Sequence, residues 1–128
     1  MNQAKINNTN ATNASKAYIK TIKDQLLDEQ AIILFDDLDW IPLNGISQNK
    51  SDLYPIVSTG KGEKVLLLHG FDSCFLEYRR LTPFLKKKNK LIIPDLYGFG
   101  FCPRSIGNKY GFNYLMQHLN SVLNYFSE

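Results

Sequence analysis

The sequence is poor in the residues that bind metals or form disulfides. Its only cysteines are Cys74 and Cys102, which form no Cys-x-x-Cys pair and have no histidine at ligand spacing. Neither a disulfide framework nor a zinc site is indicated by this pattern. We therefore expect no metal and no cofactor.

Long apolar runs are also missing. No stretch approaches the roughly 18 apolar residues that cross a membrane. The first residues, MNQAKINNTNATNASK, lack both the apolar core of a signal peptide and the arginines of a transit peptide. We expect a cytoplasmic protein without a membrane span.

Positive charge is not concentrated enough to predict a nucleic-acid partner. Fifteen basic and twelve acidic residues give a net charge of +3, and the basic residues are scattered except at Lys86, Lys87, Lys88 and Lys90. Nucleic-acid-binding domains gather more positive charge on one face. We interpret this lysine run as a solvated loop after a helix, whose carboxyl end favours cations.

The chain divides into three parts. Residues 1–14 are polar and asparagine-rich, which predicts a disordered tail. Residues 15–39 have apolar residues at steps of three and four, which predicts one amphipathic helix or two in succession. The aspartates that end this part, Asp36, Asp37 and Asp39, follow a helical pattern rather than a strand, so we interpret them as surface residues and not as a magnesium site. Residues 40–128 form the remaining domain.

This domain alternates strands and helices. Val65–Leu68 and Leu91–Ile93 are unbroken apolar runs, as in parallel strands buried on both faces. Gly60-Lys61-Gly62 precedes a strand, so it is a turn and not a phosphate loop. The other expected elements are two strands at 40–46 and 53–58, a helix at 75–86 that is kinked at Pro83, and a core-packed helix at 112–126. His118 lies off the apolar stripe of the last helix, which predicts a solvated side chain.

These elements predict an α/β fold with flanking helices, in which the last two strands are parallel. Functional groups in such sheets gather at the carboxyl ends of the strands, here the loops at 69–74 and 95–105. Gly98 and Gly100 form only a bare Gly-x-Gly, because Pro103 stands where a dinucleotide loop needs its third glycine.

Two motifs resemble the first half of an α/β-hydrolase, in the branch of epoxide hydrolases, dehalogenases and esterases. The first is the apolar strand that ends in His69-Gly70-Phe71-Asp72-Ser73, and the second is Pro94-Asp95-Leu96-Tyr97-Gly98-Phe99-Gly100. In that family the backbone N–H after His-Gly helps to hold the oxyanion of a tetrahedral intermediate.

The resemblance implies a role for each residue of these loops. The amide of Phe71 would be the oxyanion donor, and His69 and Gly70 would shape the loop that presents it. Asp72, Ser73, Phe99 and Phe101 would lie on the substrate side, with Arg104 as a further neighbour of the pocket.

The nucleophile of the family is missing. A Gly-x-Ser-x-Gly elbow, followed by an acid and a histidine, occurs nowhere in these 128 residues; Ser47 and Ser73 stand in other contexts. Ser73 and Cys74, both near the candidate oxyanion loop, are alternative nucleophiles, and Cys74 near the start of a helix could be activated there. The sequence offers no histidine and acid to complete the set for either residue.

We therefore predict the amino-terminal portion of an α/β-hydrolase, truncated before the elbow and inactive alone. The complete family member would hydrolyse an ester or a related small molecule. An open strand edge at 64–69 would favour self-association or a second polypeptide that supplies the missing strands. The alternative is a non-catalytic α/β interaction module.

Overall fold

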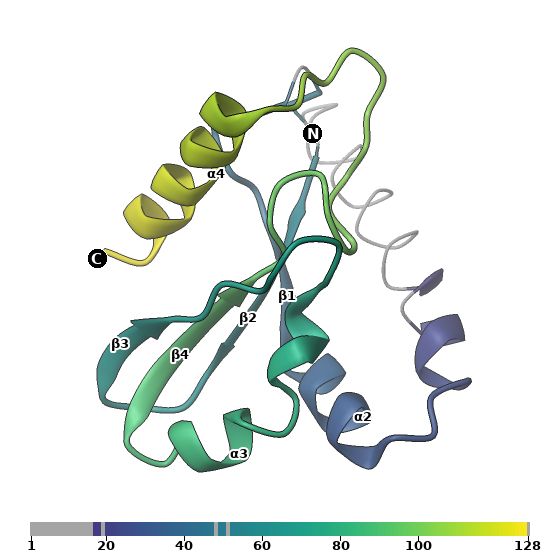
Figure 1. Ribbon diagram of the computed structural model, residues 1–128, viewed down its shortest axis with the longest axis vertical. Coiled ribbons are helices and arrows are strands. Elements are labelled where there is room, and N and C mark those ends of the chain that lie inside the picture. Colours follow the sequence, from purple (N-terminus) through teal and green to yellow (C-terminus); the bar gives the residue numbers. More distant parts are fainter. Residues whose placement is uncertain (1–16, 19, 48, 51, 128) are drawn as a thin grey trace, which may run out of the picture.

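A computed structural model describes residues 17–18, 20–47, 49–50 and 52–127 (Figure 1). The predicted disordered tail lies outside these residues. The sheet has the strand order β1-β2-β4-β3, in which β3 and β4 are parallel and the other two pairs are antiparallel. The bounds are Leu38–Ile41 for β1, Tyr54–Thr59 for β2, Glu63–Leu66 for β3 and Asn89–Pro94 for β4. The prediction of an α/β fold with a parallel last pair is confirmed.

The first strand differs in its bounds from the prediction. Strand β1 begins at Leu38, which pairs with Val57, and ends at Ile41, which pairs with Tyr54. Pro42 follows, and its missing N–H cannot continue the ladder. The predicted strand at 40–46 is therefore wrong beyond residue 41.

The amino-terminal segment forms two helical pieces, the second of the two predicted alternatives. Residues 17–18 and 20–23 are helical, and α2 spans Glu29–Asp36. Asp28 caps α2 by accepting hydrogen bonds from the amides of Gln30 and Ala31. The described residues contain no cluster of three or more acidic, histidine or cysteine side chains that could hold a metal ion, and no helix long and apolar enough to cross a membrane.

The segment between β3 and β4 contains two short helices rather than the single kinked helix that was predicted. A 3-10 helix, η1, spans Phe75–Tyr78, and α3 spans Thr82–Leu85. Pro83 lies in the first turn of α3, where its missing N–H leaves no helical hydrogen bond unmade. The proline therefore starts a helix and does not kink one.

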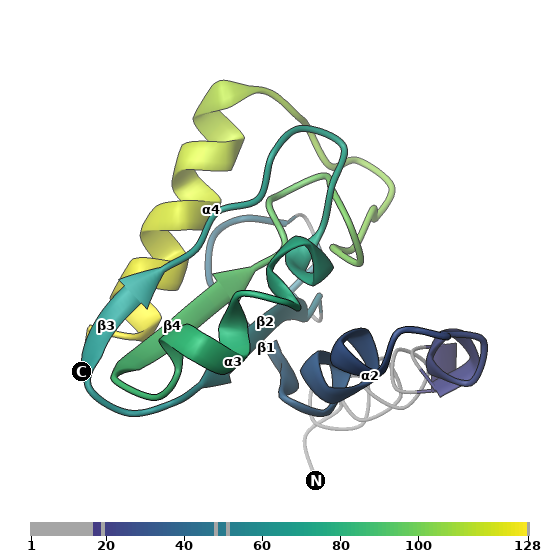
Figure 2. The same cartoon turned by 60° about the horizontal axis from the view of Figure 1, so that its bottom comes forward.

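Helices cover both faces of the sheet (Figures 1 and 2). Helix α4 (Phe112–Tyr125) packs over one face, and α2, η1 and α3 lie over the other. Neighbouring residues of the central strands alternate between the two cores, as the pleat requires. Ile56, Ile92 and Val122 belong to the α4 side, and Val57, Leu91, Ile93, Phe35 and Phe75 belong to the other side.

The two apolar strand runs are buried to different degrees. Leu91, Ile92 and Ile93 are 0%, 4% and 0% exposed, as predicted for a strand buried on both faces. The residues of Val65–Leu67 are only partly buried, so the same prediction is wrong for β3. The reason is position, because β4 is central and β3 is at the edge of the sheet.

Helix α4 also differs from its predicted environment. His118 is fully buried, so the prediction of a solvated side chain is wrong. The buried face of the helix runs through His118 and Val122, while Phe112, Met116 and Leu123 of the predicted apolar stripe are exposed. Packing against the sheet therefore uses only one side of a wide apolar surface.

Candidate functional site

The loops that follow β3 and β4 are joined by His69. This side chain is buried, and its Nε2 accepts a hydrogen bond of 2.9 Å from the backbone N–H of Leu96. Its Nδ1 lies 2.8 Å from the carbonyl oxygen of Gly70. The two predicted loops thus meet at one end of the strands, as the loops at the carboxyl ends of neighbouring parallel strands do.

These contacts fix the tautomer of His69. A backbone N–H can only donate, so Nε2 must carry its lone pair, and Nδ1 then donates its proton to the Gly70 carbonyl. An imidazole held in this way has no free lone pair with which to take a proton from a nucleophile. The geometry therefore suits a positioning role for His69 better than that of a general base.

The amide of Gly70 is also engaged. It donates a hydrogen bond of 3.0 Å to Oε2 of Glu77 in η1. This bond, together with one from the Ser73 hydroxyl, lowers the pKa of Glu77. Glu77 thereby anchors the start of the loop that carries Phe71, and the hydroxyl of Ser73 is committed to the same carboxylate.

Phe71 has a free backbone donor. Among the described residues, no atom accepts a hydrogen bond from its N–H, in contrast to the neighbouring amide of Gly70. Its side chain is 90% exposed, and its ring meets Phe99 edge-to-face at 5.3 Å between centroids. Asp72 follows with a φ of 54°, a left-handed conformation that turns the chain back toward η1.

Asp95 is the residue of this site that the sequence reasoning missed. Its buried carboxylate accepts hydrogen bonds of 2.6 Å from the amide of Phe75 and 2.7 Å from the amide of Phe101. Burial raises the pKa of Asp95, and the two amides offset part of this effect. A Cβ on Gly100 would lie 2.2 Å from Oδ2 of Asp95, so only glycine fits there. The Pro-Asp-x-x-Gly-x-Gly pattern contained the signal, since both residues belong to it.

The two phenylalanines predicted on the substrate side have different surroundings. Phe99 contacts His69 and Phe71 at the site, with 6.2 Å between its ring centroid and that of His69. The ring of Phe101 packs instead against Phe35 and Phe75, within the core on the α2 side of the sheet. Arg104 donates to the carbonyl groups of Gly98 and Gly100 and so holds the same loop.

The described residues contain no activated nucleophile. Burial raises the pKa of Cys74, which is the opposite of what a reactive thiol requires. The hydroxyl of Ser47 donates to Asp52 in a separate loop. Both ring nitrogens of His69 are occupied, and those of His118 are buried without a partner. No described serine or cysteine is therefore paired with a histidine base.

Hydrolases are among the curated and solved proteins to which the chain is similar in sequence and fold. The chain is 33% identical over 82 residues to 2-hydroxy-6-oxo-2,4-heptadienoate hydrolase of Pseudomonas putida. The matched residues make up 62% of this chain and 28% of that enzyme. A variant of the meta-cleavage product hydrolase from Pseudomonas fluorescens superposes with a TM-score of 0.58 and 26% identity, over 67% of this chain and 30% of that one. No family model matches the sequence.

A third similarity concerns the fold alone. A haloalkane dehalogenase variant from Bradyrhizobium elkanii superposes with a TM-score of 0.60 at 22% identity, over 70% of this chain and 28% of that one. The chain thus spans less than a third of the length of each of these three proteins, and the partial coverage fits an amino-terminal portion. On its strand order, its two loop motifs and these similarities, the chain has the fold of the amino-terminal portion of an α/β-hydrolase.

Proposed function

We propose that this chain supplies the oxyanion-binding side of a hydrolase site, and that the nucleophile, acid and catalytic histidine come from residues outside these 128. The observation that carries the proposal is the unpartnered amide of Phe71, at the end of a loop fixed by His69 and Glu77. A donor that is held in place but not used within the loop is what stabilisation of a developing negative charge requires.

In the complete site, a serine oxygen would attack the carbonyl carbon of the substrate. The carbonyl oxygen would then take up the negative charge, and the Phe71 N–H would donate a hydrogen bond to it. The catalytic histidine would take the serine proton and pass it to the alcohol, which leaves as the tetrahedral intermediate collapses to an acyl-serine. Water would then hydrolyse this ester and release the acid, without a cofactor. His69 would act by positioning: it joins the Phe71 loop to the loop after β4.

The substrate class of this proposal is a small ester or a related carbonyl compound. The similar enzyme of Pseudomonas putida is named for hydrolysis of 2-hydroxy-6-oxo-2,4-heptadienoate, so this compound is a suitable second test substrate. The exposed ring of Phe71 and its neighbour Phe99 offer an apolar wall to such a molecule.

The edge strand supports the idea that further strands complete the sheet. The amide of Leu67 donates to the carbonyl of Ile92, so residue 67 directs its backbone toward β4. Successive residues of a strand direct their backbone groups to opposite sides, so Leu66 directs its N–H and C=O away from the sheet. An apolar strand with such an edge is a template for another strand.

The side chains beside this edge favour the same proposal. A cavity of about 320 Å³ lies between β3, β4 and the end of α4, and its lining includes Leu66, Leu123 and Phe126. The exposed residues Phe112 and Met116 continue the apolar surface along α4. A strand and helix added beside β3 would cover this surface, which is otherwise in contact with water.

The test is hydrolysis with and without the polypeptide encoded immediately downstream. We expect no turnover of p-nitrophenyl acetate or of the dienoate by the 128 residues alone, and turnover when both polypeptides are expressed together. Phe71→Pro, which removes the N–H, should lower kcat by about 100- to 1000-fold, whereas Phe71→Ala, which keeps it, should retain most of the rate. Activity of the short chain alone would overturn the proposal.

The second candidate is a non-catalytic interaction module, which the apolar β3 edge also favours. It predicts a downstream sequence without a Gly-x-Ser-x-Gly segment and a later acid and histidine. It also predicts that a bound partner covers β3 without generating hydrolysis of either substrate.

A further inference from the structure

Basic side chains from two turns meet at the end of the sheet opposite the candidate site. The β2–β3 turn contains Gly60-Lys61-Gly62, and the α3–β4 connection contains the lysine run of residues 86–90. A Cβ on Gly60 would lie 2.2 Å from the carbonyl oxygen of Asn89, and one on Gly62 would lie 2.1 Å from that of Lys88. The two turns are therefore packed backbone against backbone, and Lys61 lies beside the run.

The two turns themselves are rich in positive charge, although Asp37 of the α2 segment lies beside Lys86. Residues 60–64 and 80–90 contain a single acid, Glu63, and the following basic residues: Lys61, Lys64, Arg80, Lys86, Lys87, Lys88 and Lys90. The lysine run follows the end of a helix, as expected from the sequence, but the attraction of that helix end for cations is weak. Helix α3 is a single turn, from Thr82 to Leu85, and carries little dipole.

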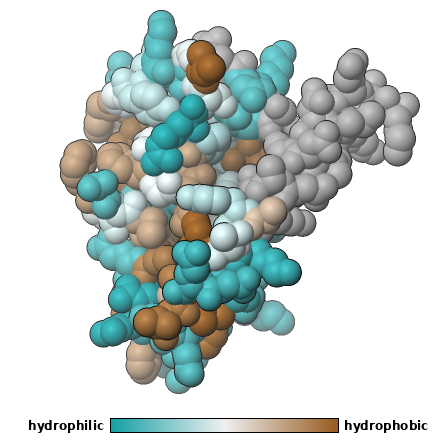
Figure 3. Space-filling view, turned by 90° about the vertical axis from the view of Figure 1, so that its right-hand side faces the viewer, coloured by the Kyte–Doolittle hydropathy of each residue, from teal (hydrophilic) through white to brown (hydrophobic). Residues whose placement is uncertain are grey.

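Apolar side chains project among these cations. Phe84 is 70% exposed and Leu81 is also exposed, both at α3. The Nζ of Lys87 lies 5.8 Å from the centroid of the Phe84 ring. Figure 3 shows hydrophobic surface interspersed with hydrophilic surface at the lower end of the molecule, where Figure 1 places α2 and α3. We call Lys61, Leu81, Phe84, Lys86, Lys87 and Lys88 the basic end.

We propose that the basic end docks onto an anionic membrane surface. Lysines at a bilayer surface are attracted to anionic headgroups, while an aromatic ring and a leucine beside them enter the boundary of the acyl chains. A nucleic-acid backbone would satisfy the lysines but offer no apolar partner to Leu81. Among these ligands, charge and apolar exposure together fit a lipid surface best.

The orientation is compatible with the candidate site. Strands β3 and β4 run in parallel from the basic end toward the loops of His69 and Asp95. Docking through the basic end would therefore leave the Phe71 loop directed away from the membrane.

The test is sedimentation of the full chain with vesicles of phosphatidylcholine that contain about one third phosphatidylserine, compared with pure phosphatidylcholine. We expect binding only to the anionic vesicles, and its loss in 0.5 M salt, which shortens the Debye length to roughly 4 Å. The double variant Lys87→Glu/Lys88→Glu should bind at least about tenfold more weakly. Phe84→Ala should bind about fivefold more weakly.

Two controls match these variants. Lys50→Glu/Lys109→Glu makes the same change of net charge in other exposed loops, and Ile106→Ala removes an exposed apolar side chain from the loop that precedes α4. Both should bind like the unmodified chain. Absence of binding to the anionic vesicles, equal losses in the two charge variants, or retention by single-stranded RNA or an acidic peptide in preference to vesicles would overturn the proposal.

Discussion

Strands β3 and β4 are parallel neighbours with similar apolar sequences, yet only β4 is buried on both faces. The loop after β4 is also closed around a buried carboxylate, Asp95, whereas the loop after β3 exposes Phe71 and leaves its amide without an acceptor among the residues that the structure describes. The difference teaches that the β4 half is structurally complete within these residues. The β3 half leaves an open strand edge, as the proposed function requires.

The largest expected effect contrasts one leucine from each strand. Leu91→Ala should lower the free energy of unfolding by about 2 to 5 kcal/mol, because it leaves a cavity in the core. Leu66→Ala should cost about 1 kcal/mol, because this side chain is already partly exposed. Urea denaturation measures both. Equal costs in the isolated chain would contradict the comparison.

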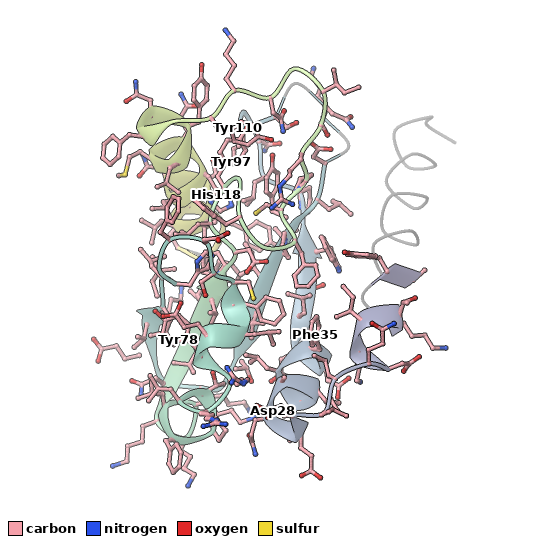
Figure 4. The ribbon with its side chains drawn as sticks, turned by 45° about the vertical axis from the view of Figure 1, so that its right-hand side comes forward. Asp28, Phe35, Tyr78, Tyr97, Tyr110 and His118 are labelled. Atoms are coloured by element: carbon pink, nitrogen blue, oxygen red, sulfur yellow. The ribbon has the colours of Figure 1, made fainter. Side chains whose placement is uncertain are left out.

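The pH dependence of stability tests the buried layer under α4. His118 contacts Tyr54 there, and also Tyr97, beside which Figure 4 shows it. Burial lowers the pKa of His118 from 6.5 to about 4. At a pH between these two pKa values, the imidazole is neutral in the folded protein, whereas it takes up a proton in the unfolded chain. Stability should therefore fall by about 3 kcal/mol as the pH drops from 6.5 to 4.

The matched variant for this prediction is His118→Leu, which removes the histidine contribution. Burial raises the pKa of Asp95, so this carboxyl acts in the opposite direction and favours the folded state at low pH. The difference between the two proteins isolates His118. If both lose stability in parallel over this range, the imidazole is not buried as described.

The closed loop after β4 is tested with two glycines of positive φ. Gly100→Ala strains the backbone and also drives a Cβ into the Asp95 carboxylate, whereas Gly45→Ala meets no atom within 4 Å. We expect a loss of about 1 kcal/mol for Gly45→Ala from conformation alone and about 2 kcal/mol or more for Gly100→Ala. Thermal unfolding of both variants provides the measurement, and similar losses would argue against a tight fit at Asp95.

The smallest effect concerns the link between the two loops. His69→Ala leaves the Leu96 amide without its acceptor and should cost about 1 to 2 kcal/mol. His69→Asn, which can still accept a hydrogen bond, should recover part of this loss. The unfolding midpoints of the two variants measure this difference. If His69→Ala leaves the free energy of unfolding unchanged, His69 does not position the two loops.

The sequence correctly predicted the buried central strand. It did not predict features that depend on which other elements pack beside a residue. The apolar run Leu91–Ile93 correctly indicated a strand buried on both faces, because such a strand needs no polar face. The same pattern in Val65–Leu68 did not by itself reveal that β3 lies at the edge of the sheet; that position was predicted only through the resemblance to α/β-hydrolases. His118 was misplaced because periodicity marks apolar positions and cannot recognise a histidine that packs among tyrosines.

The loops show the same limit. The His-Gly and Pro-Asp motifs identified the two segments that meet, but not the bonds between them. The roles of His69 toward Leu96, and of Asp95 toward Phe75 and Phe101, depend on contacts between residues distant in sequence. No local pattern encodes those pairings.

The most direct test is amide hydrogen exchange at Leu66 and Leu67, measured with and without the downstream polypeptide. In the chain alone, the Leu67 amide should be protected by the Ile92 carbonyl, while the outward amide of Leu66 exchanges freely. The added polypeptide should slow exchange at Leu66 by at least about tenfold and leave Leu67 protected. An unchanged, rapid exchange at Leu66 would contradict the account that β3 receives the rest of the sheet.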